Sequence, residues 1–430
     1  MAISTLYPSS RPSLSLDFAK SKRLDPRISF SRTHTGSIAS YTDANGLIRF
    51  AGPDAPRFDH DPATGESLGL LVEESRTNLN IQSSFTPGYS RIGFSSVTKD
   101  AIGPDGQDNT AMTLTEISGS NPGQCVVYAD FNVANNNQVF THSVFVKAAL
   151  RDEFQLNIHN IGTTAGNTTS INAIYNTTTE DFTTAEMGGP SATALIGYGV
   201  VKYPNGWYRI WASGNVGNSD QTTTNLRFHV RTLENNGSYI GSGQIAGYIY
   251  GGQIELGSFP TSYIPTSGSA VTRPADNVTI TGDSFLEFMN DLEGTLGLTI
   301  IPRHQSSTGT DSTSLRLKGV GGGGDNIRYI RQNVSNIFDC ASQTAYPAGP
   351  TNYGGMGASI TNEDNILFIG YSESNDVFRC KKDNNVLITK TGLAPIVSSS
   401  LEAYSRSATY KKIIFYPHLI SNSQFQTLTK

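Results

Sequence analysis

The amino-acid sequence predicts an all-β protein of several domains, and three observations lead to this prediction. Charged residues make up only 16% of the 430 residues and aromatic residues make up 10%, a balance typical of chains that build packed cores. Gly, Ser, Thr and Asn are abundant, as exposed sheet faces and tight turns require. Short runs of alternating apolar and polar residues recur along the chain, without long helical patterns between them.

Residues 1 to about 80 are expected to form a first unit. Its opening, Tyr7-Pro8-Ser9-Ser10-Arg11-Pro12, predicts an extended arm because proline fixes the backbone and removes a hydrogen-bond donor. Two hairpins follow, with turn sequences between β-like runs: Asp43-Ala44-Asn45-Gly46 between residues 38–41 and 47–50, and Pro62-Ala63-Thr64-Gly65 between residues 57–61 and 67–72.

Residues 81–276 carry the clearest strand patterns and predict an antiparallel jelly-roll sandwich. The period of two places Phe154, Leu156 and Ile158 on one strand face, and Leu226, Phe228 and Val230 on another. Many short strands at close spacing are typical of a sandwich or jelly roll. A proline-punctuated segment over residues 259–274 should run extended on the surface, and the domain boundary is placed just after it.

Residues 277–430 are predicted to form a second β-sandwich. Residues 296–301, 366–371 and 413–416 read as central strands, and residues 377–380 and 386–388 as the arms of a hairpin. A short C-terminal helix capped by Ser423 is expected near residues 423–428. Gly321 to Gly324 reads as a flexible loop. A phosphate-binding loop is not favoured there, because the Lys-Ser/Thr ending and the following helix of such loops are missing.

The composition argues against several classes of partner. The formal net charge is −5 and no Lys/Arg run is present, so nucleic acid is not an expected partner. No apolar stretch approaches the roughly 18 residues of a membrane helix, and residues 1–5 lack a signal-peptide pattern, which predicts synthesis in the cytoplasm without export by that route. Cys125, Cys340 and Cys380 are expected to be buried free thiols, although the last two could meet in space.

Three stretches carry a resemblance to known proteins: residues 14–18, 24–32, 56–61 and 73–79; residues 205–209, 252–257 and 260–266; and residues 414–417, 419–421 and 425–429. The first resembles an N-terminal module of bacteriophage virion proteins of the tail-fibre or head-spike-fibre type. The second is similar to jelly-roll, carbohydrate-binding-module-like domains of the same proteins. The third resembles the closing strand and last turn of laminin-G/concanavalin-like sandwiches.

The resemblance implies a structural component of a phage particle, a fibre or spike that contributes to host-surface adhesion. Residues 1–80 would then anchor the chain to other virion proteins, and their removal should leave the remainder folded. The resemblance also implies a homotrimer, because phage fibres and spikes project along symmetry axes and closed rotational symmetry is the rule for homo-oligomers. A host-surface glycan is a candidate ligand. A capsid decoration protein without receptor binding is the alternative, and a polysaccharide depolymerase is less favoured because no regular β-helix repeat is found.

Asp59, His60 and Asp61, with Glu66 nearby, are the densest set of candidate metal ligands. In a regular strand Asp59 and Asp61 share one face and His60 points to the other, which divides the set. A proline-led turn follows at once. Turn and strand-edge structure is therefore favoured over a metal site, and no metal or other cofactor is expected.

Two tryptophans suggest sugar stacking, because aromatic faces pack on sugar rings. On a strand, Trp207, Arg209 and Trp211 share one face, opposite Tyr208 and Ile210. Large aromatic residues of sandwiches are more often core residues, and this interpretation is favoured more strongly for Trp207 than for Trp211. The same caution applies to Tyr248 and Tyr250, which also share a face, so no ligand-binding residue is assigned.

Glycan hydrolysis would need two carboxylates roughly 5–10 Å apart. Glu116, Glu153, Glu255 and Asp276 are available, but no local motif pairs them. Nucleophile-elbow and zinc-protease motifs are also missing from the sequence. The sequence therefore leads us to expect a protein that is not an enzyme, with no catalytic residues assigned.

Overall fold

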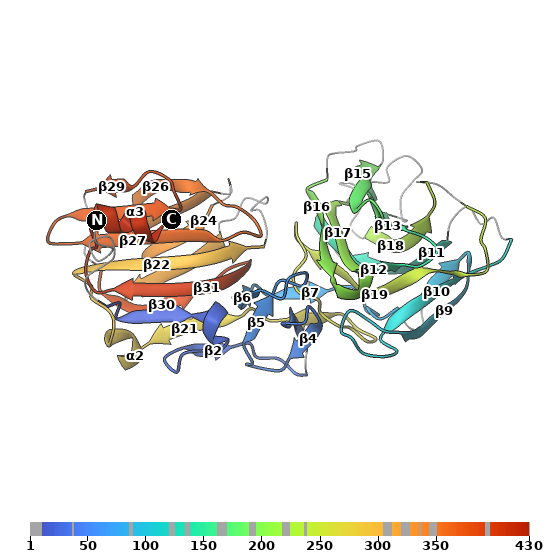
Figure 1. Cartoon of the computed structure of the whole chain (residues 1–430), viewed down its shortest axis with the longest axis horizontal. Coiled ribbons are helices and arrows are strands. Elements are labelled where there is room, and N and C mark those ends of the chain that lie inside the picture. The colour runs from blue at the N-terminus through green and yellow to red at the C-terminus, as the bar shows by residue number, and fades with distance from the viewer. Residues whose placement is uncertain are drawn as a thin grey trace.

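Two β-sandwiches lie side by side along the long axis of the molecule, joined by N-terminal strands between them (Figure 1). The computed structural model describes residues 11–429 apart from these positions: 37, 86–88, 120–124, 134–137, 161–169, 189–194, 217–223, 236–238, 304–311, 320–326, 334, 336, 344–350 and 392–395. Every strand pair among the described residues is antiparallel, and their helices have three to seven residues. The predicted all-β, multi-sandwich class is confirmed.

The central sandwich consists of two six-stranded sheets. The first has the order β16 (Gly197–Tyr203), β17 (Trp207–Asn215), β12 (Val139–Ala148), β19 (Ile245–Leu256), β10 (Ala111–Glu116) and β9 (Phe94–Ala101). The second has the order β15 (Asp181–Gly188), β14 (Ser170–Asn176), β13 (Glu153–Asn160), β18 (Thr224–Leu233), β11 (Cys125–Val133) and β8 (Ser90–Ile92).

The core of the central sandwich follows the predicted alternation. Phe154, Leu156 and Ile158 of β13 are fully buried and pack with residues of the first sheet such as Val144 and Ile210. Each buried apolar side chain of this size contributes about 1.5–3 kcal/mol relative to an exposed one. The outward face of the first sheet is left to contact the rest of the chain.

The C-terminal sandwich also has two sheets. One has the order β29 (Ile388–Lys390), β28 (Val377–Lys382), β27 (Asn365–Ser372), β22 (Glu293–Pro302), β31 (Ser407–Tyr416), β6 (Ser67–Glu73) and β5 (Arg57–His60), with β1 (Leu14–Asp17) also paired to β31. The other has the order β2 (Ser29–Ser31), β21 (Asn277–Thr281), β30 (Ser398–Ala403), β23 (Ser312–Gly319), β24 (Ile327–Gln332), β25 (Ile337–Gln343) and β26 (Thr351–Ala358).

Four of the N-terminal strands, β1, β2, β5 and β6, belong to the sheets of this C-terminal sandwich. β1 and β6 pair with successive halves of the same edge of β31, and β2 pairs with β21. Leu14 and Val72 accordingly belong to the core of the C-terminal sandwich. The structure thus differs from the separate first unit expected up to about residue 80, because these short strands bury their apolar faces only against residues far away in the sequence.

In the part of the chain that the structure describes, the remaining elements are two small sheets and four short helices. The small sheets pair β3 (Ala39–Thr42) with β4 (Ile48–Ala51), and β7 (Arg76–Asn78) with β20 (Val271–Arg273). The helices are α1 (Phe18–Ser21), η2 (Pro204–Gly206), α2 (Asp283–Leu286) and α3 (Asn422–Leu428). None of these helices among the described residues has the length and apolarity that a membrane span requires.

Several local predictions can be compared with the structure directly. Both predicted N-terminal hairpins form, as β3–β4 and β5–β6, and the third forms as β28–β29. The C-terminal helix is present, but its N-cap is Ser421, which makes a capping box with Gln424, so the prediction of Ser423 as the cap is wrong. The glycine run at residues 321–324 lies outside the described residues.

Two of the three cysteines meet inside the C-terminal sandwich. Cys340 and Cys380 are both buried free thiols, as predicted. Burial, and then a hydrogen bond with Cys380, raises the pKa of the Cys340 thiol well above its ordinary value. The side chain of Cys125 lies outside the described residues.

Candidate functional site

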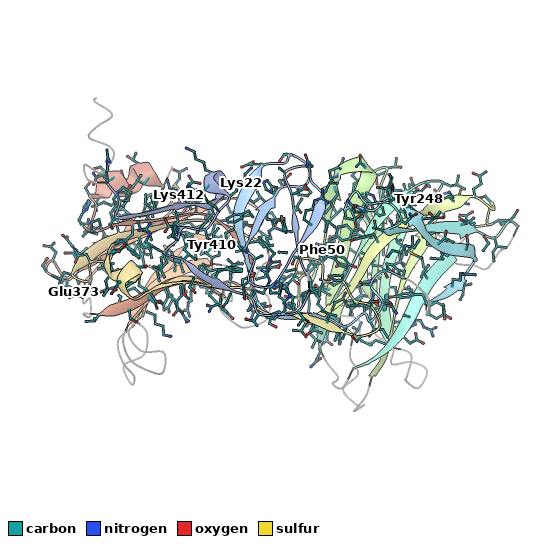
Figure 2. All side chains as sticks on the ribbon, turned by 90° about the horizontal axis from the view of Figure 1, so that it is seen from below. Lys22, Phe50, Tyr248, Glu373, Tyr410 and Lys412 are labelled. Atoms are coloured by element: carbon teal, nitrogen blue, oxygen red, sulfur yellow. The ribbon has the colours of Figure 1, made fainter. Side chains whose placement is uncertain are left out.

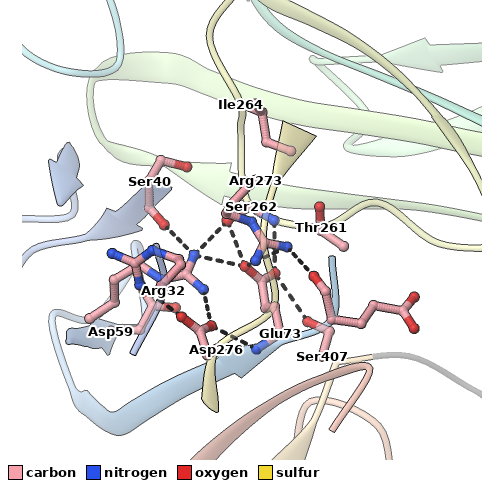
Figure 3. A network of polar contacts seen from close by, with 12 residues as sticks. Arg32, Ser40, Asp59, Glu73, Thr261, Ser262, Ile264, Arg273, Asp276 and Ser407 are labelled. Carbon is pink, nitrogen blue, oxygen red and sulfur yellow. Dashed lines mark hydrogen bonds and ion pairs between the residues drawn. The ribbon is translucent and has the colours of Figure 1, made fainter. Parts of the chain in front are cut away.

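A buried network of charged residues holds the two sandwiches together at the waist of the molecule (Figure 3). At its centre the Arg57 guanidinium donates from Nη1 to Glu73 Oε2 at 2.7 Å and to Ser262 Oγ at 2.7 Å. Its Nη2 donates to Asp276 Oδ2 at 2.5 Å. These side chains come from β5, β6 and the segment that links the sandwiches, so the network fastens three parts of the chain.

Two further arginines complete this network. Arg32 Nη1 donates to Asp276 Oδ1 at 2.7 Å, and Arg273 Nη2 lies 3.4 Å from Glu73 Oε2. Burial alone would raise the pKa of the Glu73 carboxyl, but the charges of Arg273 and Arg57 outweigh it and hold that pKa well below its ordinary value. Three guanidinium groups therefore share two carboxylates. We call Arg32, Arg57, Glu73, Arg273 and Asp276 the waist network.

The waist network gathers residues from stretches that carry the resemblance described above. Arg57 lies in the 56–61 stretch, Glu73 in the 73–79 stretch and Ser262 in the 260–266 stretch. Ser262 also donates its backbone N–H to Glu73 Oε1 at 2.9 Å. Residues of the N-terminal stretches and of the 260–266 stretch, which are far apart in the sequence, thus meet in the joint, the contact between the two sandwiches.

The outward face of the first central sheet lies against this joint. Trp207 is 1% exposed and packs with Phe145, Tyr250, Tyr263 and Ile48 in a cluster between the sheet and the β3–β4 hairpin. Figure 2 shows Phe50 of β4 between the two sandwiches. Tyr208 and Ile210 point the other way, into the sandwich core. The predicted face division is confirmed, but Trp207 is buried at the joint rather than in the sandwich core.

Beside this cluster is a cleft of about 420 Å³, which we call the junction cleft. Its walls come from the β16–β17 edge of the central sandwich, from β3 and β5, from the linking segment and from the C-terminal sandwich. The residues that line it include Thr42, Asp59, His60, Glu73, Arg209, Trp211 and Arg303. The cleft therefore exists only because the two sandwiches and the N-terminal strands meet.

Trp211 supplies an aromatic surface to the junction cleft. Its cross-strand partner is Gly199, and a Cβ at Gly199 would come within 2.9 Å of the indole nitrogen. A Cβ at Gly197 would likewise lie 3.1 Å from the ring. The indole therefore lies against two glycines of β16, and its half-buried side chain lines the cleft. A core position, predicted more strongly for Trp207 than for Trp211, therefore describes Trp211 less well.

Two buried polar side chains of the cleft have unused hydrogen-bonding capacity. Arg209 is 8% exposed; its Nη2 donates to Ser143 Oγ at 3.0 Å, whereas its Nε has no partner among the described residues. Burial lowers the pKa of this guanidinium. His60 is 6% exposed; its Nδ1 lies 3.0 Å from the carbonyl oxygen of Thr42, and its Nε2 has no described partner. Buried polar groups without partners are uncommon in folded proteins.

The candidate metal set is dispersed in the structure. Asp59 forms an ion pair with Arg303, Asp61 Oδ1 accepts from the backbone N–H of Thr64 at 2.8 Å, and Glu66 Oε1 pairs with Lys411 at 3.0 Å. A register shift between Asp59 and His60 interrupts the alternation, so both line the cleft instead of pointing apart. Within the described ranges, no group of three His, Cys, Asp or Glu side chains is placed to hold a metal ion.

The four carboxylates considered for hydrolysis do not line the junction cleft. Glu116 pairs with Arg151 at 2.8 Å, and Glu255 accepts from the backbone N–H of Thr261 at 3.0 Å. Asp276 belongs to the waist network, and Glu153 accepts from Asn176 Nδ2 at 3.5 Å. The carboxylates that do line the cleft are Asp59 and Glu73, both of which make ion pairs with arginine.

Sequence reasoning did not identify Glu73, Arg303 or the pairing of His60 with Arg209. The partners of the cleft are separated by up to several hundred residues, as Asp59 and Arg303 illustrate, so local spacing carried no signal for them. The one available signal was Arg209, a charged residue between two tryptophans on a strand face.

Comparisons with known proteins gave structural likenesses only. No family model and no curated protein sequence matches the chain. The carbohydrate-binding module CBM40 of a Ruminococcus gnavus sialidase, bound to α2,3-sialyllactose, is 9% identical, with a TM-score of 0.28 over 33% of this chain and 83% of that one. A Trypanosoma rangeli sialidase is 9% identical, with a TM-score of 0.28 over 94% and 99% of the two chains.

A mutant NanB sialidase from Streptococcus pneumoniae is 13% identical, with a TM-score of 0.29 over 35% of this chain and 26% of that one. The expectation that this chain is not an enzyme is contradicted by these comparisons, since sialidases are enzymes, and it is withdrawn. At these identities and TM-scores, the likenesses assign neither an activity nor a ligand to the chain.

Proposed function

We propose that the chain is an adhesive component of a bacteriophage particle, a fibre or spike protein that binds a host-surface glycan in the junction cleft. The observation that carries the binding part is the cleft, about 420 Å³ in volume, with Trp211 and two under-used polar side chains in its lining. Small-ligand sites are hollows of about 300–1,000 Å³ with apolar and aromatic walls and a few placed polar groups.

The particle part of the proposal rests on the sequence resemblance and is supported by the construction of the joint. A protein that projects from a particle must hold its distal domain at a fixed distance. The waist network and the aromatic cluster around Trp207 bury charged and apolar groups between the sandwiches, which opposes bending at the joint. The resemblance to phage fibres and spikes, which project along symmetry axes, supports a closed homotrimer, with residues of the N-terminal region bound to other virion proteins.

Intrinsic fluorescence tests glycan binding directly, because Trp207 and Trp211 are the chain's two tryptophans. In the Trp207→Phe variant, Trp211 is the remaining fluorophore, and oligosaccharides from the host surface should change its emission as they bind. The Trp211→Phe variant is the matched control and should show no such change. An unchanged Trp211 signal with every host-surface oligosaccharide would argue against the cleft as the site.

Product analysis of the same mixtures separates binding from hydrolysis. Single-site affinity should be weak, with a Kd on the order of millimolar or about −4 kcal/mol, because the cleft offers few polar contacts. Several copies on one particle would strengthen attachment through effective concentration. Chromatography of the sugars after incubation then shows whether the bound glycan is also cleaved.

Deletion of residues 1–10 tests the particle role without removing a described strand. The truncated protein should keep the thermal stability of the full chain but should no longer enter particles when it replaces the full chain during infection. Normal incorporation of the truncated protein would contradict anchoring through this arm.

A further inference from the structure

We propose that the junction cleft selects a sugar that carries a carboxylate, an inference that rests on the proposed glycan role. The carboxylate would bind Arg209, and a ring hydroxyl would bind His60. Neither residue has a partner inside the described structure that accounts for its full hydrogen-bonding capacity. The two residues come from different parts of the chain, β17 and β5, and both line the cleft.

Arg209 is a buried cation that makes no direct ion pair among the described residues, and the carboxylates of Glu255 and Glu73 act on it only from a greater distance. Its guanidinium carbon lies 5.3 Å from the centre of the Phe145 ring, and Ser143 provides its hydrogen-bond acceptor. A guanidinium keeps its proton in proteins, so it cannot become neutral to relieve the burial. Burying an unpaired charge is costly, and an anion with two oxygens would offset that cost by accepting paired N–H bonds.

The other charged side chains of the cleft are already paired. Asp59 forms its ion pair with Arg303, and Glu73 forms ion pairs with Arg57 and Arg273. Arg57 and Arg273 also belong to a network in which guanidinium groups outnumber carboxylates. Charge complementarity at the cleft therefore favours an anionic ligand over a neutral or cationic one.

His60 adds a requirement for a hydroxyl group. The carbonyl oxygen of Thr42 can only accept, so the Nδ1 of His60 must carry the hydrogen that joins them. In the neutral ring Nε2 is then an acceptor, and it has no described donor. A sugar hydroxyl is a suitable donor, and it reaches the buried Nε2 only if the wall of the cleft shifts slightly on binding.

The half-buried indole of Trp211 completes the set by offering an apolar surface to a ring. A carboxylate for Arg209, a hydroxyl for His60 and a ring face for Trp211 occur together in acidic sugars. A simple inorganic anion would satisfy Arg209 alone, which is why the combination points to this class of ligand.

The test compares acidic sugars with neutral sugars of the same ring, followed through Trp211 emission in the Trp207→Phe variant. The probes are D-glucuronate against D-glucose, and N-acetylneuraminate against its methyl ester. At least one acid should bind at least tenfold more tightly than its neutral counterpart. The Arg209→Gln variant should lose this preference, whereas the His60→Phe variant should bind acid and neutral sugars more weakly by a similar factor.

Equal binding of acids and neutral counterparts by the Trp207→Phe protein would overturn the inference, and this comparison does not depend on how the Arg209 variant folds. A preference that survives in a folded Arg209→Gln variant would also overturn it. Binding of host oligosaccharides without binding of either acid would reject the acidic class while leaving the proposed glycan role intact. If neither the host oligosaccharides nor the probes bind, the proposed glycan role fails as well.

Discussion

At the scale of single residues, the waist is the feature that decides how this chain is held together. Arg57 makes ion pairs with both Glu73 and Asp276, and all three side chains are at most 1% exposed. Two buried carboxylates in contact with one arginine are stable only while every partner is present, because an uncompensated buried charge is far costlier than an exposed one.

Removing the central guanidinium should therefore destabilise the protein strongly. We expect Arg57→Met to lower the free energy of unfolding by about 3–5 kcal/mol in urea denaturation. Arg227→Met is the matched control, since Arg227 and Asp130 form an ion pair with side chains 32% and 45% exposed, and the loss should be below about 1 kcal/mol. Equal losses in the two variants would show that the waist network does not stabilise the fold as described.

A second residue-scale prediction concerns pH. His142 lies in the core of the central sandwich with neither ring nitrogen partnered among the described residues, and burial lowers its pKa to about 3. The unfolded chain binds a proton there below about pH 6.5, and the folded chain only near pH 3. Between these values the unfolded state binds more protons, so the contribution of His142 to stability is lost as pH falls.

Replacing this histidine by an apolar residue should remove part of the pH dependence. In His142→Leu, the free energy of unfolding should fall less steeply between pH 6.5 and 4 than in the unaltered protein. At pH 7 the variant should be about as stable as the original, because no hydrogen bond within the described structure is lost. Parallel stability curves for the two proteins would contradict this account.

At the scale of elements, the strands and turns could be predicted from the sequence, but which strands pair with one another could not. The Asn-Gly turn of β3–β4 and the alternation in β13 each follow from a few neighbouring residues. The pairing of β1 and β6 with β31, across more than 330 residues, does not. For the same reason the division of Trp207 and Tyr208 between two strand faces was predicted, while the hairpin that covers Trp207 was not.

The turn between β3 and β4 shows how an element is fixed by its neighbours. A Cβ at Gly46 would lie 2.3 Å from the carbonyl oxygen of Pro62 and 2.6 Å from Pro204 Cγ. Gly36 has the same φ of +75° but nothing within 4 Å of such a Cβ. Both substitutions to alanine incur the backbone cost of about 1 kcal/mol, and Gly46→Ala adds a clash.

Thermal unfolding should separate the two contributions. Gly36→Ala is expected to reduce stability by about 1 kcal/mol, and Gly46→Ala by about 2 kcal/mol more, of the order of an overpacked site. Because the β3–β4 turn touches the central sandwich through Pro204, the second variant should also weaken glycan binding in the cleft. Equal losses of stability would mean that the turn does not dock as described.

At the scale of the whole molecule, the N-terminal strands make two sandwiches into one body. They supply four strands and several core residues to the C-terminal sandwich and a hairpin to the outward face of the central one. Residues 81–430 are therefore not expected to stay fully folded without the first 80 residues.

In a chain that lacks residues 1–80, we expect the C-terminal sandwich to lose its fold and the central sandwich to keep it. The edge of β31 would be left unpaired, and Leu14, Leu16, Leu70 and Val72 would be missing from the C-terminal core. Limited proteolysis of the truncated chain should cut within the strands β22 and β31 of the C-terminal sandwich and spare the strands β12 and β19 of the central one, whereas all four strands should resist in the full chain. Protection of both regions in the truncated chain would contradict this prediction.

Adhesion through the cleft at the waist of the molecule can be decided with a glycan array that is probed with multivalently displayed protein. The unaltered chain and Tyr404→Ala, which alters an exposed aromatic residue of the C-terminal sandwich, should retain the same host-surface glycans. Trp211→Ala should lose them. Retention of the same glycans by Trp211→Ala, or retention of none by the unaltered chain, would contradict adhesion through the cleft.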